Sequence, residues 1–292
     1  MTRTVLVTGA TGRVGGQVAA QFTGSDVRVR ALARNPAAAA TQLDTSVEIV
    51  SGDLAAPSTV AGALDGVDAV FLVFPSVVAD AAARELVATL ATHVRRIVYL
   101  SAHGVPDPPG EQTPDGTIMG SHAHLEGLIA AATDEYSFLR ASGFAANTLG
   151  WAQQIRHSDV LRWFLPEATR ALVHEADLAA VAVRAFTENG HERMAYHLTG
   201  PEQLTQAEQL DAIGAALGRT LRFDEVRVED AGAELFPDLP ADVVRSIVNG
   251  HARMVKDPEP VSDTVERLIG RPATTFTQWA RDHAADFARR DG

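Results

Sequence analysis

The stretch Thr4-Val5-Leu6-Val7-Thr8-Gly9-Ala10-Thr11-Gly12-Arg13-Val14-Gly15 decides the fold of this 292-residue chain. Its apolar run over 4–8 predicts a buried strand, and a helix pattern begins at Arg13. Between them the glycines follow the spacing G-x-x-G-x-x-G. Such glycines permit a tight turn, close approach of backbone to a pyrophosphate, and close packing of helix on strand. A turn required only for packing is the alternative, but the strand before it and the helix after it favour dinucleotide binding.

Strands and helices alternate through the first half of the chain. The predicted strands are nearly continuous in apolar residues, which is typical of parallel strands buried on both faces. We therefore expect an α/β protein with a Rossmann-type, doubly wound parallel sheet. Its further strands are predicted over 27–33, 47–51, 69–73, 96–100 and 136–140, and its helices over 13–23, 57–64, 78–92 and 122–132. A long loop rich in Pro, Gly and Asp is predicted over 101–119.

The second half is predicted to be mainly helical. Helix patterns cover 175–188, 205–217, 241–255 and 275–289, and short strands are expected over 196–198 and 221–228. We divide the chain into a dinucleotide-binding domain over 1–150 and a smaller, mainly helical region over 151–292 that caps the substrate. Part of 172–199 is allowed to return to the first domain.

The composition excludes several classes of function. The chain has 25 basic and 37 acidic residues and a net charge of −12, which argues against nucleic acid as a partner. The absence of cysteine excludes disulfides and thiolate chemistry, and predicts a cytoplasmic location. We expect no secretion leader, no membrane span and no metal site. A small-molecule substrate is expected, and both a monomer and a homodimer stay open.

The residue at the end of the second strand indicates which nicotinamide cofactor is bound. Sites for NAD usually carry Asp or Glu here, to bind the ribose 2′-hydroxyl. Arg34 stands near that position and Arg13 lies in the glycine turn, and two guanidinium groups can clamp a 2′-phosphate. We therefore predict NADP(H), with a solvated Arg34 as the alternative. Arg30 is a weaker candidate.

Further cofactor contacts are predicted along the carboxyl ends of the strands. Asp53 either accepts a bond from the adenine amino group or caps a helix before Pro57, and the sequence leaves both open. Phe74 and Pro75 are expected to line the cofactor cleft. The complete predicted set is Gly9, Thr11, Gly12, Arg13, Val14, Gly15, Arg34, Asp53, Leu54, Phe74, Pro75 and Ser101.

Several motifs together resemble one family. They include Leu32-Ala33-Arg34-Asn35-Pro36, Gly52-Asp53-Leu54, Ile97-Val98-Tyr99-Leu100-Ser101 and Leu198-Thr199-Gly200-Pro201. The chain resembles the NmrA-like proteins within the atypical short-chain dehydrogenases/reductases, over nearly its whole length. The resemblance implies NAD(P)H binding. It does not name a substrate, because members include quinone and enone reductases as well as cofactor-sensing regulators without catalysis.

The usual catalytic pair of short-chain dehydrogenases, Tyr-x-x-x-Lys, is absent, and Lys256 is the only lysine. What remains is Ser101 and His103 at the end of the fifth strand, and His122, which shares a helix face with Glu126. Histidine titrates near neutrality and can donate to a developing oxyanion. His122 is therefore predicted as proton donor or substrate anchor. Ordering of the loop or of the cofactor amide is the alternative.

A substrate pocket is predicted from aromatic and polar residues after the sixth strand. Phe144, Asn147, Trp151 and Trp163 form this predicted pocket, although core packing is the more common use of tryptophan. The sequence thus favours hydride transfer from NADPH to a quinone, enone or carbonyl compound. The alternatives are a non-catalytic NADP sensor and an unusual isomerase or rearrangement enzyme on the same scaffold.

Overall fold

The computed structural model describes residues 3–74, 80–107 and 117–289. Contacts between Cα atoms divide the chain into two compact units. The first holds Met1–Ala141, Glu175–Leu198 and Arg267–Gly270, and the second holds Ser142–His174, Thr199–Glu266 and Arg271–Gly292. The division therefore falls after Ala141 instead of after residue 150, and the chain returns to the first unit at Glu175.

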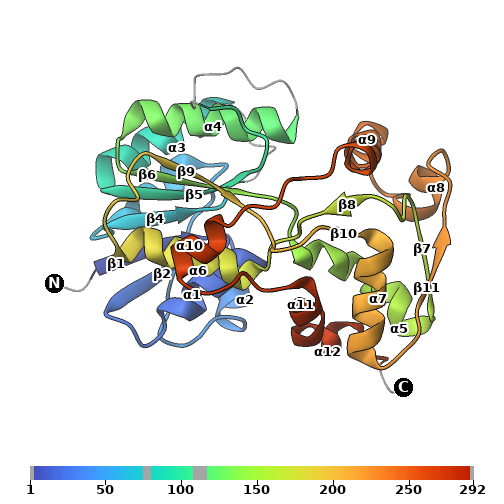
Figure 1. Cartoon of the computed structure of the whole chain (residues 1–292). Coiled ribbons are helices and arrows are strands. Elements are labelled where there is room, and N and C mark those ends of the chain that lie inside the picture. Colours follow the sequence, from blue (N-terminus) through green and yellow to red (C-terminus); the bar gives the residue numbers. More distant parts are fainter. Residues whose placement is uncertain (1–2, 75–79, 108–116, 290–292) are drawn as a thin grey trace. The chain divides into compact units, whose positions relative to one another are not determined.

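A seven-stranded parallel sheet forms the centre of the first unit (Figure 1). The strand order is β3-β2-β1-β4-β5-β6-β9. This order reverses direction at β1, which confirms the predicted doubly wound Rossmann-type fold. The strands are β1 (Arg3–Thr8), β2 (Val27–Ala33), β3 (Glu48–Ser51), β4 (Ala69–Leu72), β5 (Arg96–Ala102), β6 (Tyr136–Ala141) and β9 (Met194–Leu198).

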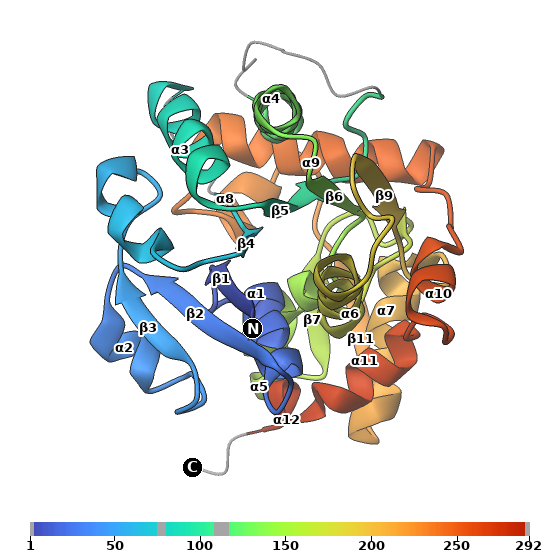
Figure 2. The same ribbon diagram turned by 90° about the vertical axis from the view of Figure 1, so that its left-hand side faces the viewer.

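Helices cover both faces of this sheet. The helices α1 (Arg13–Phe22) and α6 (Glu175–Thr187) pack together on one face, and α3 (Asp80–His93) and α4 (Ile118–Ala132) pack together on the other (Figure 2). The short helix α2 (Pro36–Ala40) follows β2. Burial of both faces explains the apolar strands, because almost every β1 and β5 side chain is removed from water.

Two predicted helices of this unit differ in the structure. Residues 57–64 form the 3₁₀ helices η1 (Pro57–Thr59) and η2 (Ala61–Leu64) instead of one α-helix, in a stretch with β-branched residues and Gly62. Helix α4 begins at Ile118 and not at residue 122, because the Thr117 hydroxyl accepts a hydrogen bond from the Gly120 N–H at 2.9 Å. The predicted loop over 101–119 is accordingly shorter.

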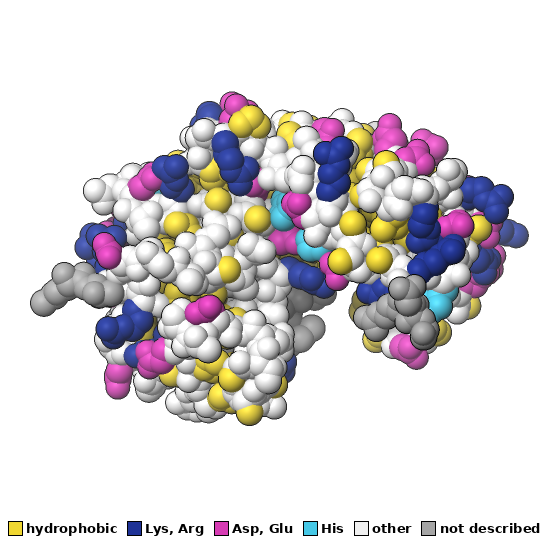
Figure 3. All heavy atoms as spheres, turned by 90° about the horizontal axis from the view of Figure 1, so that it is seen from below, with side chains coloured by type: hydrophobic (Ala, Val, Ile, Leu, Met, Phe, Trp, Pro, Cys, Tyr) yellow, Lys and Arg dark blue, Asp and Glu magenta, His cyan; other side chains and the backbone are white. Residues whose placement is uncertain are grey.

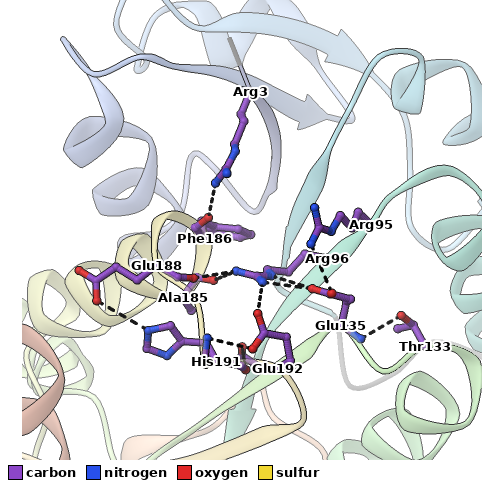
Figure 4. Close-up of polar contacts among 12 residues, drawn as sticks. Arg3, Arg95, Arg96, Thr133, Glu135, Ala185, Phe186, Glu188, His191 and Glu192 are labelled. Atoms are coloured by element: carbon purple, nitrogen blue, oxygen red, sulfur yellow. Dashed lines mark hydrogen bonds and ion pairs between the residues drawn. The ribbon is translucent and has the colours of Figure 1, made fainter. Parts of the chain in front are cut away.

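A buried arginine fixes the return of the chain to the sheet (Figure 4). The Arg96 guanidinium at the start of β5 donates to the carbonyl oxygens of Ala185 and Glu188, at 2.7 and 3.1 Å. These carbonyls belong to the carboxyl end of α6, where unpaired acceptors need partners. Arg96 also pairs with Glu135 at 3.1 Å and with Glu192 at 2.5 Å. One cation therefore connects β5, the start of β6, the end of α6 and the turn before β9.

The second unit combines short sheets with helices. Its strands are β7 (Val160–Trp163), which pairs with β11 (Arg222–Glu225), and β8 (Thr169–Arg170), which pairs with β10 (Leu204–Thr205). Its helices are η3 (Ala145–Trp151), α5 (Ala152–His157), α7 (Gln206–Leu217), α8 (Ala231–Leu235), α9 (Ala241–Lys256), α11 (Phe276–Asp282) and α12 (Ala284–Phe287). The helix α10 (Thr264–Ile269) crosses the division between the units. The helix predicted over 275–289 is therefore two helices, interrupted at His283.

Basic and acidic side chains are interspersed over the face of the molecule that Figure 3 draws. Such a surface differs from the continuous basic patch that phosphate-backbone binding requires. Among the described residues, none of the helices is long and apolar enough to cross a bilayer.

Candidate functional site

The glycine turn after β1 is built as the sequence predicts. Gly9 has a φ of +62°, and its carbonyl accepts from the Gly12 N–H at 2.8 Å. A Cβ atom on Gly15 would lie 2.3 Å from the Gly9 oxygen, so a larger residue cannot take this position without moving backbone. These contacts bring the first turn of α1 directly against the turn. Close packing of this kind lets the backbone approach a bound phosphate.

No described side chain caps the backbone N–H groups at the amino end of α1. Gly12 is the N-cap residue and supplies no side-chain cap, and the first turn contains no acidic residue. Thr11 and Arg13 are exposed beside it, whereas Val14 is buried in the core. A helix N-terminus of this length carries a partial positive charge. The turn therefore fits the pyrophosphate of a dinucleotide.

Two arginines follow the neighbouring strands β1 and β2: Arg13 begins helix α1 after the glycine turn, and Arg34 comes directly after β2. Thr8 pairs with Leu32 in the sheet, so Arg13 and Arg34 both follow closely on adjacent strand ends. Both side chains are exposed, and no described residue forms a hydrogen bond or ion pair with either of them. Arg30 differs, because it pairs with Glu48 at 3.0 Å and donates to two carbonyl oxygens. Arg13 and Arg34 are therefore available to an anion, and Arg30 is structural.

Three of the four cofactor-contact residues predicted after β3 and β4 also have structural contacts within the first unit. An Asp53 carboxylate oxygen accepts from the Ala55 N–H at 2.9 Å and so closes a turn. The N-cap residue of η1 is Ala56, so Asp53 is not the helix cap that was one of its two predicted roles. Leu54 is buried and Phe74 is half-buried, and both belong to the core of the first unit. Pro75 lies outside the described residues.

A buried ion pair connects β6 to α4. Glu126 and Arg140 are both 0% exposed, and the Arg140 guanidinium donates to the Glu126 carboxylate from Nη2 at 2.7 Å and from Nε at 3.0 Å. Burial alone would lower the pKa of Arg140, but hydrogen bonds and charge from Glu126 and Asp107 raise this pKa. Arg140 is thus a buried cation that connects β6 to α4 through its pair with Glu126.

This ion pair also binds Ser101. The Ser101 hydroxyl, at the end of β5, donates to Glu126 at 2.6 Å, and the side chain is 2% exposed. Its proton is therefore committed to a carboxylate. A role for Ser101 as donor to a substrate would require that bond to break.

Two histidines lie at the ends of β5 and β9, beside the same cation. The rings of His103 and His197 are 5.6 Å apart and meet edge to face. Asp107 pairs with Arg140 at 2.7 Å and lies 3.9 Å from His197. Burial, and then the charge of Arg140, lower the pKa of His197. Sequence reasoning missed His197 and Asp107, because the short strand predicted over 196–198 was given no neighbour in the sheet and Asp107 lay in a predicted loop.

His122 lies on α4 opposite the middle of β5. Its Nδ1 atom is 2.5 Å from the Tyr99 hydroxyl oxygen, and burial lowers the pKa of His122 to about 4. Sequence reasoning also missed Tyr99. Strand alternation could have found it, because Tyr99 and Ser101 lie on one face of β5, just as His122 and Glu126 lie on one face of α4. His124 points elsewhere and pairs with Asp80 of α3 at 2.5 Å.

The predicted pocket residues of the second unit divide into core and surface. Trp151 is 3% exposed and packs in the hydrophobic core of this unit, which is the alternative that the sequence left open for it. Trp163 is half-buried against Trp151 and donates from its indole N–H to Gln206 at 3.1 Å. Phe144 is half-buried and Asn147 is exposed. Phe144 and Asn147 thus keep accessible surface, and Trp151 does not.

Comparison with known proteins identifies the family. The model of the NmrA-like family matches residues 1–279, and the chain belongs to this family. A relative from Streptomyces griseus subsp. griseus, named (4-alkanoyl-5-oxo-2,5-dihydrofuran-3-yl)methyl phosphate reductase, is 38% identical, with 97% of this chain and 99% of that protein covered. An NAD(P)H azoreductase of Xenophilus azovorans is 31% identical, with the same coverage.

A solved structure shows the same fold. The NADPH-dependent quinone oxidoreductase of Escherichia coli, complexed with NADPH, has a TM-score of 0.79 and 24% identity, with 95% of this chain and 99% of that chain covered.

Proposed function

We propose that this protein is an NADP(H)-dependent reductase that transfers hydride from NADPH to a small quinone, enone or carbonyl compound. The observation that carries the proposal is the uncapped glycine turn together with Arg13 and Arg34, which form no hydrogen bond or ion pair with any described residue. The turn fits the pyrophosphate, and Arg13 and Arg34 fit the 2′-phosphate that distinguishes NADP from NAD. The names of the two curated relatives, both reductases, support the same reaction class.

The residues of the first unit supply the environment for such a reaction. Gly9, Gly12 and the start of α1 would hold the phosphates, and the end of β5 would lie toward the nicotinamide, as in other doubly wound sheets. The nicotinamide supplies the hydride, so the protein needs to bind, orient and stabilise charge. We place this activity in the cytoplasm, the compartment that the cysteine-free sequence predicts.

A non-catalytic NADP sensor is the second candidate, and one observation favours it. The chain lacks the Tyr-x-x-x-Lys pair, so the usual proton donor of short-chain dehydrogenases is missing. A sensor would bind NADPH and NADP⁺ with different affinities and consume neither. A reductase would oxidise NADPH in the presence of an acceptor.

The test is steady-state oxidation of NADPH, followed by nicotinamide absorbance, with a panel of quinones, enones and ketones. NADH is run beside NADPH. Turnover with NADPH and weak turnover with NADH is the expected result. Tight binding of NADPH without turnover on any acceptor would refute the reductase and favour the sensor.

A further inference from the structure

Strand β5 and helix α4 meet at two matched positions. Tyr99 and Ser101, two residues apart on β5, contact His122 and Glu126, four residues apart on α4. The Ser101–Glu126 contact belongs to the buried ion pair with Arg140. The contact between Tyr99 and His122 differs, because no described residue forms an ion pair with either side chain.

The direction of this hydrogen bond follows from burial. Tyr99 is 1% exposed, and no described residue other than His122 forms a hydrogen bond with its hydroxyl. A buried hydroxyl proton requires an acceptor, so the Tyr99 O–H donates to His122 Nδ1. The same burial raises the pKa of Tyr99, with the charge of Glu126 adding to it, so the hydroxyl keeps its proton. A neutral imidazole that accepts at Nδ1 carries its own proton at Nε2.

The charge state of His122 is set by its surroundings. Burial lowers its pKa to about 4, so the ring is neutral at pH 7. Glu126, one turn further along α4, is paired with Arg140 on β6, and Asp80 on α3 is paired with His124 and Arg84. Glu126 and Asp80 therefore have cationic or histidine partners of their own. No described residue accepts a hydrogen bond from His122 Nε2.

We propose that Tyr99 is a positioning residue that holds His122 as its neutral Nε2–H tautomer, and that this N–H donates to the acceptor oxygen on which charge develops during reduction. This inference rests on the proposed reductase function and deepens it. The acceptor carbon gains a hydride from the reduced nicotinamide, and the π electron pair of the conjugated acceptor moves to its oxygen. His122 stabilises this oxyanion without losing its proton, and water supplies the proton that completes the product.

A neutral His122 imidazole as hydrogen-bond donor restricts the substrates to those that yield a weakly basic oxyanion. A neutral imidazole is a much weaker acid than an imidazolium, so it stabilises an oxyanion but does not protonate it. Suitable acceptors are quinones, which yield a phenolate, and enones with a second carbonyl on the same carbon, which yield an enolate shared between two oxygens. An isolated ketone would yield a strongly basic alkoxide and needs a full proton transfer. We expect such ketones to be poor substrates.

The tautomer is measured by nitrogen NMR on the ¹⁵N-histidine-labelled protein without cofactor. Loss of signals in His122→Gln assigns the ring. At pH 7 we expect an unprotonated Nδ1 and a protonated Nε2, and a titration midpoint below that of ordinary histidines. In Tyr99→Phe, which removes only the hydroxyl, the Nδ1 resonance should shift. A protonated Nδ1 in the wild type at pH 7, in either the other tautomer or an imidazolium, would overturn the proposal.

Kinetics with a quinone test the role of the N–H group. His122→Leu should lower kcat about 100-fold, as loss of an oxyanion donor does, with little change in KM. His122→Gln restores an N–H and should stay within about tenfold of the wild type, and Tyr99→Phe should lower kcat about threefold to tenfold. His93→Gln, at an exposed site on α3, is the matched control. Thermal unfolding of each variant checks that the fold is kept.

Two outcomes separate this inference from the reductase function itself. If His122→Leu reduces quinones as fast as the wild type, or if isolated ketones react as well as quinones, the inference is wrong and the reductase stands. If bound NADPH is oxidised by no acceptor, the reductase function is wrong, and the substrate assignment falls with it.

Discussion

Neutralising Glu126 tests whether its buried ion pair with Arg140, between α4 and β6, stabilises the fold. Glu126→Gln keeps the shape of the side chain and removes its charge. Among the described residues, Arg140, which is 0% exposed, would then keep only Asp107 as a charged partner, on a side chain that is 58% exposed. Removing one partner of a fully buried pair typically costs about 3–5 kcal/mol. Because Asp107 and the Pro106 carbonyl remain, we expect a loss near the lower limit, about 3 kcal/mol.

The assay is urea unfolding followed by circular dichroism. A loss of about 3 kcal/mol lowers the unfolding midpoint without a change in slope. Glu48→Gln is the matched control, since Glu48 pairs with Arg30 but is 42% exposed, and should lose no more than about 1 kcal/mol. Added salt should weaken the Glu48 pair and leave the Glu126 pair almost unchanged. Equal losses in the two variants would refute the reasoning.

Three other changes have defined outcomes. Arg34→Ala should weaken the binding of NADPH about 10- to 100-fold and leave the binding of NADH unaffected, as measured by fluorescence titration. Arg28→Ala, at the other end of β2, removes the same charge as a control. An equal loss of NADPH affinity in Arg28→Ala would contradict a local clamp. Gly15→Ala should lower the free energy of unfolding by about 1–3 kcal/mol, because its Cβ would lie 2.3 Å from the Gly9 oxygen. Gly16→Ala, whose Cβ would lie 3.2 Å from the Ala10 oxygen, should lose less stability in the same urea unfolding assay. The lowered pKa of His122 means that the unfolded state binds a proton below pH 6.5 and the folded state binds it only near pH 4. Acidification through this window should therefore remove about 3 kcal/mol of stability, and an unfolding series in His122→Gln that loses as much as the wild type would exclude this cause.

The sheet could be predicted from sequence because its strands are buried on both faces. Apolar runs placed β1, β2 and β4 to β6 within one or two residues of their observed ends. The start of α4 was missed, because Thr117 and Ile118 follow a stretch rich in Pro and Gly and the cap became visible only from its hydrogen bond. The strand β7 depends on β11, far along the chain, and local sequence does not contain such pairing.

The candidate site divides in the same way. The glycine turn and Arg34 are local features with a defined spacing, so sequence was sufficient to propose them. Tyr99 and His197 matter only through partners on other elements, His122 and Asp107. A search for catalytic motifs does not find such residues, because their roles come from the packing of α4 on β5 and from the edge strand β9.

The return of the chain at Glu175 has a consequence for synthesis on the ribosome. Strand β6 is complete at Ala141, but its neighbour β9 ends only at Leu198, after a long excursion into the second unit. Until β9 has emerged, β6 is an open sheet edge, and such edges pair readily with other chains. Folding of the first unit during translation must therefore wait for the segment that Arg96 anchors. A chain that stops at residue 150 would keep its complete glycine turn and yet be prone to aggregate.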